Sequence, residues 1–267
     1  MINTIVKPKI HFIHIYEAQN TGEMACSPFE YFGKEFSRYY DCLCHDLRSL
    51  NLTKISPADW VILGGGGLFE VREDFQQTIN LILNRTYKVI SWSCGHNHHN
   101  ERVINSKIDY SKFFMLTVRD FGMQNQEYLP CVSCMNRELE KESQAVRKFG
   151  IIEHLDYPIN AWEIDKISNS FSIYSITKFI SESECIITNS YHCLYWASLM
   201  KKKVLLYEPF SSKFSNFEFK PVLIDRNSDL NKAFDDAVIY EKSLQKCREM
   251  NENFKTKLLK TMLKIDS

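Results

Sequence analysis

One stretch of the chain, residues 185–208, predicts a strand–helix–strand unit. Residues 185–189 form an apolar run typical of a buried strand, residues 191–201 have helical character, and residues 204–208 are apolar again. A connection of this kind brings its two strands parallel in one sheet. His192 then falls at the carboxyl end of the first strand, where open parallel sheets hold their ligands. It is either a catalytic residue or a histidine satisfied by the polar neighbours Asn189, Ser190 and Tyr191.

Short apolar runs alternate with longer amphipathic runs along the rest of the chain. In the first half we expect a strand over 10–16, a helix over 29–47, a strand over 59–63, a helix over 74–84 and strands over 88–93 and 113–118. In the second half we expect a charged helical run over 137–148, a strand over 148–154, a helix over 173–180, a strand over 222–225 and mostly helix over 229–264. The pattern predicts an α/β fold with two Rossmann-like parallel-sheet domains, residues 1–128 and 129–267, that face a cleft. The last helix is expected to pack back on the domains through Leu244, Met250, Phe254, Leu258 and Met262.

The second predicted strand of the first half runs directly into Gly64-Gly65-Gly66-Gly67. This turn holds four of the nine glycines in the chain. Consecutive glycines indicate unusual backbone dihedrals or a very close approach by another group. The turn either presents backbone N–H groups to an anion or is simply a tight structural turn.

Polar residues also follow the next predicted strands. His96, His98 and His99 lie close together after one strand, and they either line a polar loop of the cleft or belong to a metal site. Arg119 and Asp120 follow another strand. Arg119 is suited to bidentate contact with a carboxylate or phosphate, and the alternative is a surface pair or helix cap with Asp120.

Composition narrows the classes of function. Lys plus Arg and Asp plus Glu both number 33, so the chain lacks the basic excess of nucleic-acid-binding proteins. The N-terminal IHFIHIY is short and interrupted by two histidines, and no other run approaches the ~20 apolar residues of a membrane span. We therefore expect a cytoplasmic protein. The nine cysteines are odd in number and are expected to be reduced. Cys131 and Cys134 form a lone CxxC, which either shapes a loop or binds zinc.

Several motifs, taken in order, resemble the polysaccharide pyruvyl transferase family. They are Asn20-Thr-Gly-Glu23, DWVILGGGGLF from Asp59, ISWSCGHN from Ile90, LTVRD ending at Asp120, ITNSYHCLYWASLMKKKV and PFSSKF. Two positions depart from the family pattern, because Glu23 replaces an aspartate and Ser190 replaces an arginine two positions before the histidine. The donor is therefore left open by the sequence, as are the acceptor sugar, the linkage and the oligomeric state.

The resemblance implies a GT-B-like enzyme that transfers a pyruvyl group from phosphoenolpyruvate to a sugar of a cell-surface polysaccharide, such as a capsule or exopolysaccharide, and forms a ketal. His192 and Arg119 are the expected catalytic residues, with no metal and no cofactor beyond the donor substrate. The acceptor is a saccharide, free or lipid-linked, and a lipid-linked acceptor would bring the enzyme to the inner membrane face. The expected substrate-binding residues are Asn20, Glu23, Gly65, Gly66, Gly67, His96, Asn97, Asp120, His154, Asn189, Ser190, Tyr191, Ser211, Ser212 and Lys213. Two alternatives are a glycosyltransferase that uses a nucleotide sugar and a non-catalytic sugar- or anion-binding protein.

Overall fold

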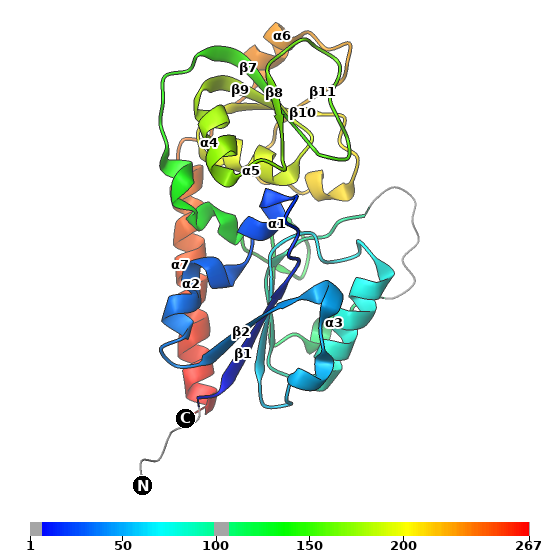
Figure 1. The fold of residues 1–267 in the computed structure, drawn as a ribbon, viewed down its shortest axis with the longest axis vertical. Coiled ribbons are helices and arrows are strands. Elements are labelled where there is room, and N and C mark those ends of the chain that lie inside the picture. The colour runs from blue at the N-terminus through cyan, green and yellow to red at the C-terminus, as the bar shows by residue number, and fades with distance from the viewer. Residues whose placement is uncertain (1–6, 99–106, 267) are drawn as a thin grey trace.

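The computed structural model describes residues 7–98 and 107–266, and it contains two parallel β-sheets (Figure 1). The first sheet has six strands in the order β2-β1-β3-β4-β5-β6. Their bounds are β1 Lys9–His14, β2 Asp41–Asp46, β3 Trp60–Gly64, β4 Val89–Cys94, β5 Met115–Val118 and β6 Glu127–Tyr128. The helices in this part of the chain are α1 Thr21–Ala25, α2 Pro28–Phe36 and α3 Glu73–Arg85.

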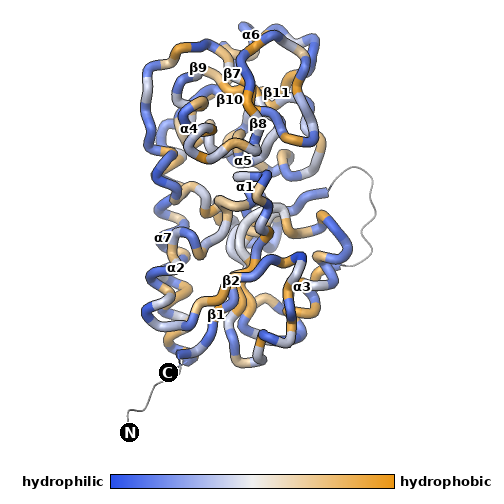
Figure 2. Tube along the Cα trace, in the orientation of Figure 1, coloured by the Kyte–Doolittle hydropathy of each residue, from blue (hydrophilic) through white to orange (hydrophobic). Residues whose placement is uncertain are grey.

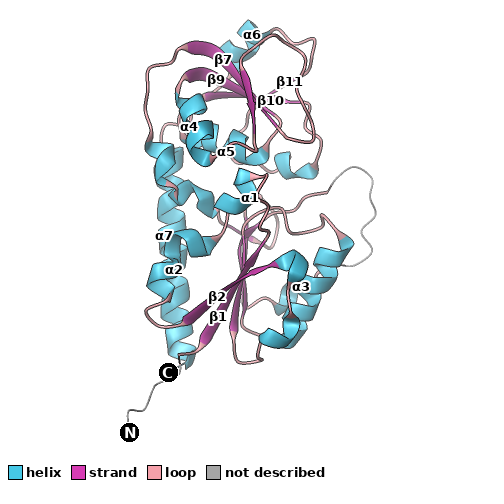
Figure 3. Ribbon diagram, in the orientation of Figure 1, coloured by secondary structure: helices cyan, strands magenta, loops and turns pink. Residues whose placement is uncertain are grey.

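The second sheet has five strands in the order β11-β10-β9-β7-β8. Their bounds are β7 Arg147–Glu153, β8 Lys166–Ser168, β9 Ser183–Thr188, β10 Lys203–Tyr207 and β11 Val222–Ile224. Its helices are α4 Ile173–Ser181, α5 Tyr191–Leu199 and α6 Leu230–Asp236. All strand pairs in both sheets are parallel (Figure 3), which confirms the α/β class and is consistent with two Rossmann-like domains.

The predicted unit over residues 185–208 forms β9, α5 and β10, and β9 pairs with β10 in parallel register from Cys185↔Lys203 to Thr188↔Leu206. Every residue of α5 is buried, because this helix is covered by its own sheet on one side and by other segments on the other. Every residue of β3 and β4 is likewise buried, as expected for central strands covered on both faces. Figure 2 shows the hydrophobic segments concentrated along the strands inside each half.

The long C-terminal helix α7, Ser243–Asp266, runs along both halves of the molecule (Figure 1). Its first part packs into the core of the second sheet through Leu244 and Cys247. Its later part packs against the first sheet through Phe254, Leu258 and Met262. The prediction that the apolar face of this helix packs back is confirmed. The division at residues 128 and 129 stays a prediction. No helix among the described residues has the length and apolar character that a bilayer crossing requires.

Two helix predictions were wrong. The helix expected over 29–47 ends at Phe36, and residues 41–46 form the edge strand β2 instead. Ser37 caps α2 with its hydroxyl on the Gly33 carbonyl, and residues 41–46, which are flanked by Tyr40 and Leu47, then pair along β1 despite having few strand-forming residues. The helix expected over 137–148 contains only the 3₁₀ turn Arg137–Glu140. The other 3₁₀ turns are Leu47–Ser49, Leu52–Lys54, Tyr110–Lys112, Val132–Met135 and Ser212–Phe214.

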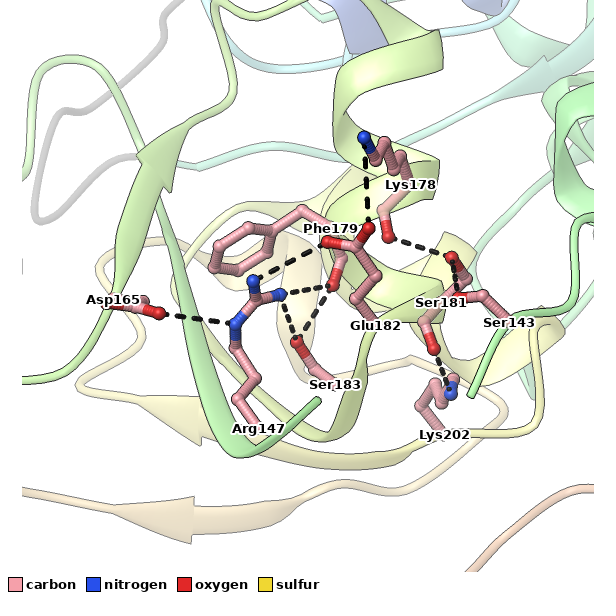
Figure 4. A network of polar contacts seen from close by, with 9 residues as sticks. All are labelled: Ser143, Arg147, Asp165, Lys178, Phe179, Ser181, Glu182, Ser183 and Lys202. Carbon is pink, nitrogen blue, oxygen red and sulfur yellow. Dashed lines mark hydrogen bonds and ion pairs between the residues drawn. The ribbon is translucent and has the colours of Figure 1, made fainter. Parts of the chain in front are cut away.

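A polar network explains why the segment before β7 is extended (Figure 4). Arg147 at the start of β7 donates to the Phe179 carbonyl and to the Ser183 hydroxyl, both at 3.4 Å, and pairs with Glu182 at 3.5 Å. Ser143 hydrogen-bonds to Ser181 at 2.8 Å. These contacts fasten the chain to the end of α4, so that long-range partners override the local helical preference.

Candidate functional site

Segments that follow strands of the first sheet contact segments that follow strands of the second sheet. We call this contact region the seam. Figure 1 shows α1, which follows β1, directly against α5, which follows β9. Gly22 of α1 packs on the His192 imidazole, and the Arg119 guanidinium after β5 lies 3.8 Å from the Tyr191 ring centroid. The carboxyl ends of strands from both sheets therefore meet at one place, as ligand-binding α/β folds require.

His192 occupies the first turn of α5 and is 5% exposed. A Cβ on Gly22 would lie 2.1 Å from His192 Nδ1, so that glycine is required for this approach. On the other ring nitrogen, Nε2 lies 3.7 Å from the Cys131 Sγ. Burial lowers the pKa of His192 well below its ordinary value, and the positive charges of Arg119 and Lys213 lower it further. The imidazole is therefore neutral near pH 7, with a ring nitrogen that is free of a proton.

Arg119 is a buried cation without a complete set of partners. It is 3% exposed, and its Nε and Nη1 atoms have no hydrogen-bond partner among the described residues. The guanidinium lies on the Tyr191 ring and against Gly95, where a Cβ would come within 2.2 Å of Nε. Buried donors without acceptors are costly, so these two nitrogens are suited to hydrogen-bond an anion.

Lys213 and Glu23 complete what we call the seam cluster, which consists of Glu23, Arg119, His192 and Lys213. The pKa of Lys213 is lowered to about 8, mainly by burial and also by the charge of Arg119, while Glu23 opposes the shift. Burial raises the pKa of the Glu23 carboxyl, and Arg119 and Lys213 oppose that shift. The cluster thus joins a neutral imidazole and a carboxyl group with a raised pKa to two cations.

The space beside the glycines of residues 64–67 is filled mainly by other parts of the protein. Gly65 and Gly66 have φ values of +58° and +73°, and a Cβ on either would collide with the Cys26 carbonyl or the Glu23 carboxylate. Gly65 donates its N–H to the Trp92 carbonyl, so this group is not available to an anion. The turn brings Glu23 close to the strand ends. Anion binding by Gly66 and Gly67 stays a prediction.

The histidine-rich loop is built around a paired carboxylate. The Asp120 Oδ2 accepts from the His96 backbone N–H at 2.8 Å and contacts the His96 ring at 3.1 Å. His98 pairs with Glu70 at 2.6 Å, whereas His99 lies outside the described residues. Asn97 is 9% exposed, and its Oδ1 has no partner within the described chain. No group of three metal-ligating side chains occurs among the residues that the structure describes.

The remaining predicted residues lie at or near the seam. Asn189 accepts from the His154 N–H and donates to the Tyr157 carbonyl, both at 2.8 Å, and so it holds the loop after β7. Ser190 is buried and its N–H donates to the Thr188 hydroxyl at 3.0 Å. Two serines and one asparagine complete the predicted site residues. Ser211 Oγ is buried without a partner among the described residues, and Ser212 Oγ accepts from the His98 N–H at 2.8 Å. Asn20 immediately precedes α1.

Some neighbours of His192 were not predicted as site residues. Cys131 lies beside Nε2, and the Trp196 ring centroid lies 5.7 Å from the His192 ring. Trp196 is one helical turn after His192, a spacing that indicates a shared face. The CxxC drew attention to Cys131, but nothing in the sequence placed it beside a residue 61 positions away. Cys134 instead lies 3.4 Å from the Asn251 amide.

Two hollows flank the seam. One of ≈420 Å³ is lined by residues that include His98, Phe210, Ser211 and Ser212. The other, of ≈240 Å³, is lined by Glu17, Gln19, Asn20, His154, Leu155, Asp156 and Asn169. Neither hollow is lined by Arg119 or His192. The seam cluster is therefore enclosed between the two halves rather than set in the wall of either hollow.

No protein-family model and no curated protein matches the sequence. Among solved structures, the chain is similar to a functionally uncharacterised protein from Klebsiella pneumoniae subsp. pneumoniae NTUH-K2044, with 15% identity and a TM-score of 0.48. That similarity covers 78% of this chain and 85% of the other. A likeness this distant does not bear on function.

Proposed function

We propose that this protein is a transferase that moves a pyruvyl group from phosphoenolpyruvate to a saccharide and forms a cyclic ketal. The observation that carries the proposal is the pair of unpartnered, buried nitrogens of Arg119 beside His192. A donor with both a carboxylate and a phosphate needs fixed positive partners, and Arg119 and Lys213 supply two of them. The motif resemblance adds the specific donor and the reaction.

The seam also accounts for the departure at Ser190. The family pattern places an arginine at this position, where it would hold the donor anion. Here the guanidinium of Arg119 lies on the ring of Tyr191, the next residue, so a positive charge reaches the same motif from the other sheet. This contact supports an anion site that is assembled from both halves, in a GT-B-like arrangement.

The pKa shifts divide the proton transfers between two residues. Neutral His192 takes the proton from the first sugar hydroxyl as that oxygen adds to C2 of phosphoenolpyruvate, and a protonated Glu23 gives a proton to the C3 methylene. The second hydroxyl then adds to C2 and the C2–O bond to phosphate breaks. The second hydroxyl proton leaves with the phosphate, and the proton on His192 is released to solvent while Glu23 takes one up, so that one diol and one donor give one ketal and one phosphate.

The test is incubation with phosphoenolpyruvate and a panel of oligosaccharides, followed by mass spectrometry for a pyruvyl ketal adduct. Arg119→Lys keeps the charge but removes the planar fork, and we expect it to lower transfer about 10²–10³-fold. Arg226→Lys is the matched control, because Arg226 is exposed. Transfer by Arg119→Lys at the rate of the control variant would contradict the assignment. Thermal stabilisation by nucleoside diphosphates and not by phosphoenolpyruvate would favour a glycosyltransferase.

A further inference from the structure

We infer that the ≈240 Å³ pocket beside the seam binds one sugar ring of the acceptor. This inference rests on the proposed function and assigns the acceptor to a place separate from the donor anion. The pocket is smaller than the ~300–1,000 Å³ of sites for drug-sized ligands, so it suits a single ring. We call it the acceptor pocket. Its lining residues are Glu17, Gln19, Asn20, His154, Leu155, Asp156 and Asn169.

The lining chemistry suits neutral hydroxyl groups. Carboxylates accept hydrogen bonds, and side-chain amides both donate and accept, so this set can bind several hydroxyls of one ring. No Lys or Arg lines the pocket, although Arg48 pairs with Glu17 at 2.9 Å from outside it. Asp156 is exposed and contributes negative charge. An anionic donor is therefore disfavoured here and favoured at Arg119 and Lys213, which separates the two substrates by charge.

Asn169 supplies a largely buried polar side chain to the pocket wall. It lines the pocket and is only 3% exposed. Its Oδ1 accepts from the Leu155 N–H at 2.9 Å, which fixes the orientation of the side-chain amide. The Nδ2 group of an amide held in this way can donate to a hydroxyl oxygen of a bound sugar.

The wall from the second half of the chain is held in shape before any ligand binds. Asn189 fixes the loop through the His154 N–H and the Tyr157 carbonyl, and Tyr157 donates its own N–H to the His154 carbonyl at 3.0 Å. The Asn169 N–H donates to the Glu153 carbonyl at 2.9 Å. A preorganised wall reduces the ordering cost of binding a small, weakly bound ligand.

The wall from the first half is tied to the second half by Thr21. Its hydroxyl donates to the Phe171 carbonyl at 2.5 Å, and its N–H donates to the Asn169 carbonyl at 3.3 Å. The loop between β1 and α1 is closed by a hydrogen bond in which the Asn20 N–H donates to the Glu17 carbonyl at 2.9 Å. The acceptor pocket therefore exists only where the two halves meet.

Both walls also lead directly to the proposed base. Asn20 precedes α1, whose Gly22 packs on the His192 ring, and Asn189 is three residues before His192 in the chain. A sugar in the acceptor pocket thus lies beside the segments that hold the imidazole.

The test is saturation-transfer NMR on the full chain without phosphoenolpyruvate, with methyl glycosides of mannose, galactose and glucose as probes. We expect at least one glycoside to bind with a millimolar Kd. Asn20→Ala and Asp156→Asn should each weaken it about tenfold, which corresponds to about 1.4 kcal/mol. The Asn20 side chain makes no capping bond to α1, so its removal should leave the fold intact. Asp235→Asn, at an exposed position on α6, is the matched control.

Three outcomes are decisive. Binding that weakens in the pocket variants and not in the control supports the acceptor pocket. Equal binding by all variants, or no binding of any glycoside, overturns it. Selective sugar binding together with no pyruvyl transfer supports the acceptor pocket and refutes only the proposed reaction, so the two proposals fail independently.

Discussion

Gly22→Ala is expected to destabilise the protein through a single contact across the seam. A Cβ at this position would lie 2.1 Å from Nδ1, 2.5 Å from Cγ and 2.8 Å from Cβ of His192. Overpacking of this kind costs about 1–3 kcal/mol. The intrinsic helical gain of alanine over glycine offsets about 0.5–1 kcal/mol of that cost, because Gly22 lies within α1. The net effect is a loss of up to about 2.5 kcal/mol.

A double-mutant cycle isolates the steric part of this effect. His192→Gly removes all three contacting atoms, so Gly22→Ala in that background should be neutral or stabilising by about 0.5–1 kcal/mol. The coupling free energy then equals the overpacking cost alone, about 1–3 kcal/mol. Urea unfolding followed by tryptophan fluorescence and circular dichroism measures all four proteins. Effects of Gly22→Ala that agree within about 0.5 kcal/mol in both backgrounds would show that α1 and α5 do not meet as described.

Two further predictions concern stability. Asn251 is fully buried on α7, accepts from the Trp92 indole N–H at 2.9 Å and donates to the Pro130 carbonyl at 3.1 Å. The Pro130 carbonyl also accepts from the Ser93 hydroxyl at 3.0 Å, so Asn251→Ala leaves only the Trp92 N–H unpaired and should cost about 1–3 kcal/mol in urea unfolding. The exposed control Asn253→Ala should change stability by less than about 0.5 kcal/mol. Burial lowers the pKa of His14 to about 4 from 6.5, although Asp46 opposes the shift. The folded state therefore binds this proton less readily than the unfolded state, and about 3 kcal/mol of stability should be lost as pH falls from 6.5 to 4. His14→Phe should remove that part of the pH dependence, and an unchanged acid profile would contradict the assignment.

Patterns within short segments predicted most strands and helices of the fold. The unit over residues 185–208 was predictable because an apolar run, a polar corner and a second apolar run all agree on a parallel pair. The edge strand β2 was not predictable. Phe29, Phe32 and Phe36 have a helical spacing, and the positions of Tyr40 and Leu47 happen to continue it. Those two side chains flank a strand whose partner, β1, lies about 30 residues earlier in the chain.

The site was predictable only as a set of strand ends. The positions of Arg119 and His192 after strands could be read from the sequence, because parallel strands present their carboxyl ends on one edge. The sequence does not reveal which residue of one sheet contacts which residue of the other. The contacts of Gly22, Tyr191 and Cys131 depend on how the two sheets pack, and no periodicity within a segment carries that information.

The electrostatics of the seam cluster favour one order of substrate binding under the proposed function. Burial lowers the pKa of His192 most, and Arg119 and Lys213 lower it further, so without a donor the imidazole is a weak base. An anionic donor would neutralise these two charges and raise that pKa toward the value at which a base works well near pH 7. The acceptor pocket lies to the side of the cluster and contributes no positive charge, so an acceptor that binds first leaves His192 unchanged. Donor binding therefore prepares His192 to deprotonate the acceptor, and the base is strongest when both substrates are present.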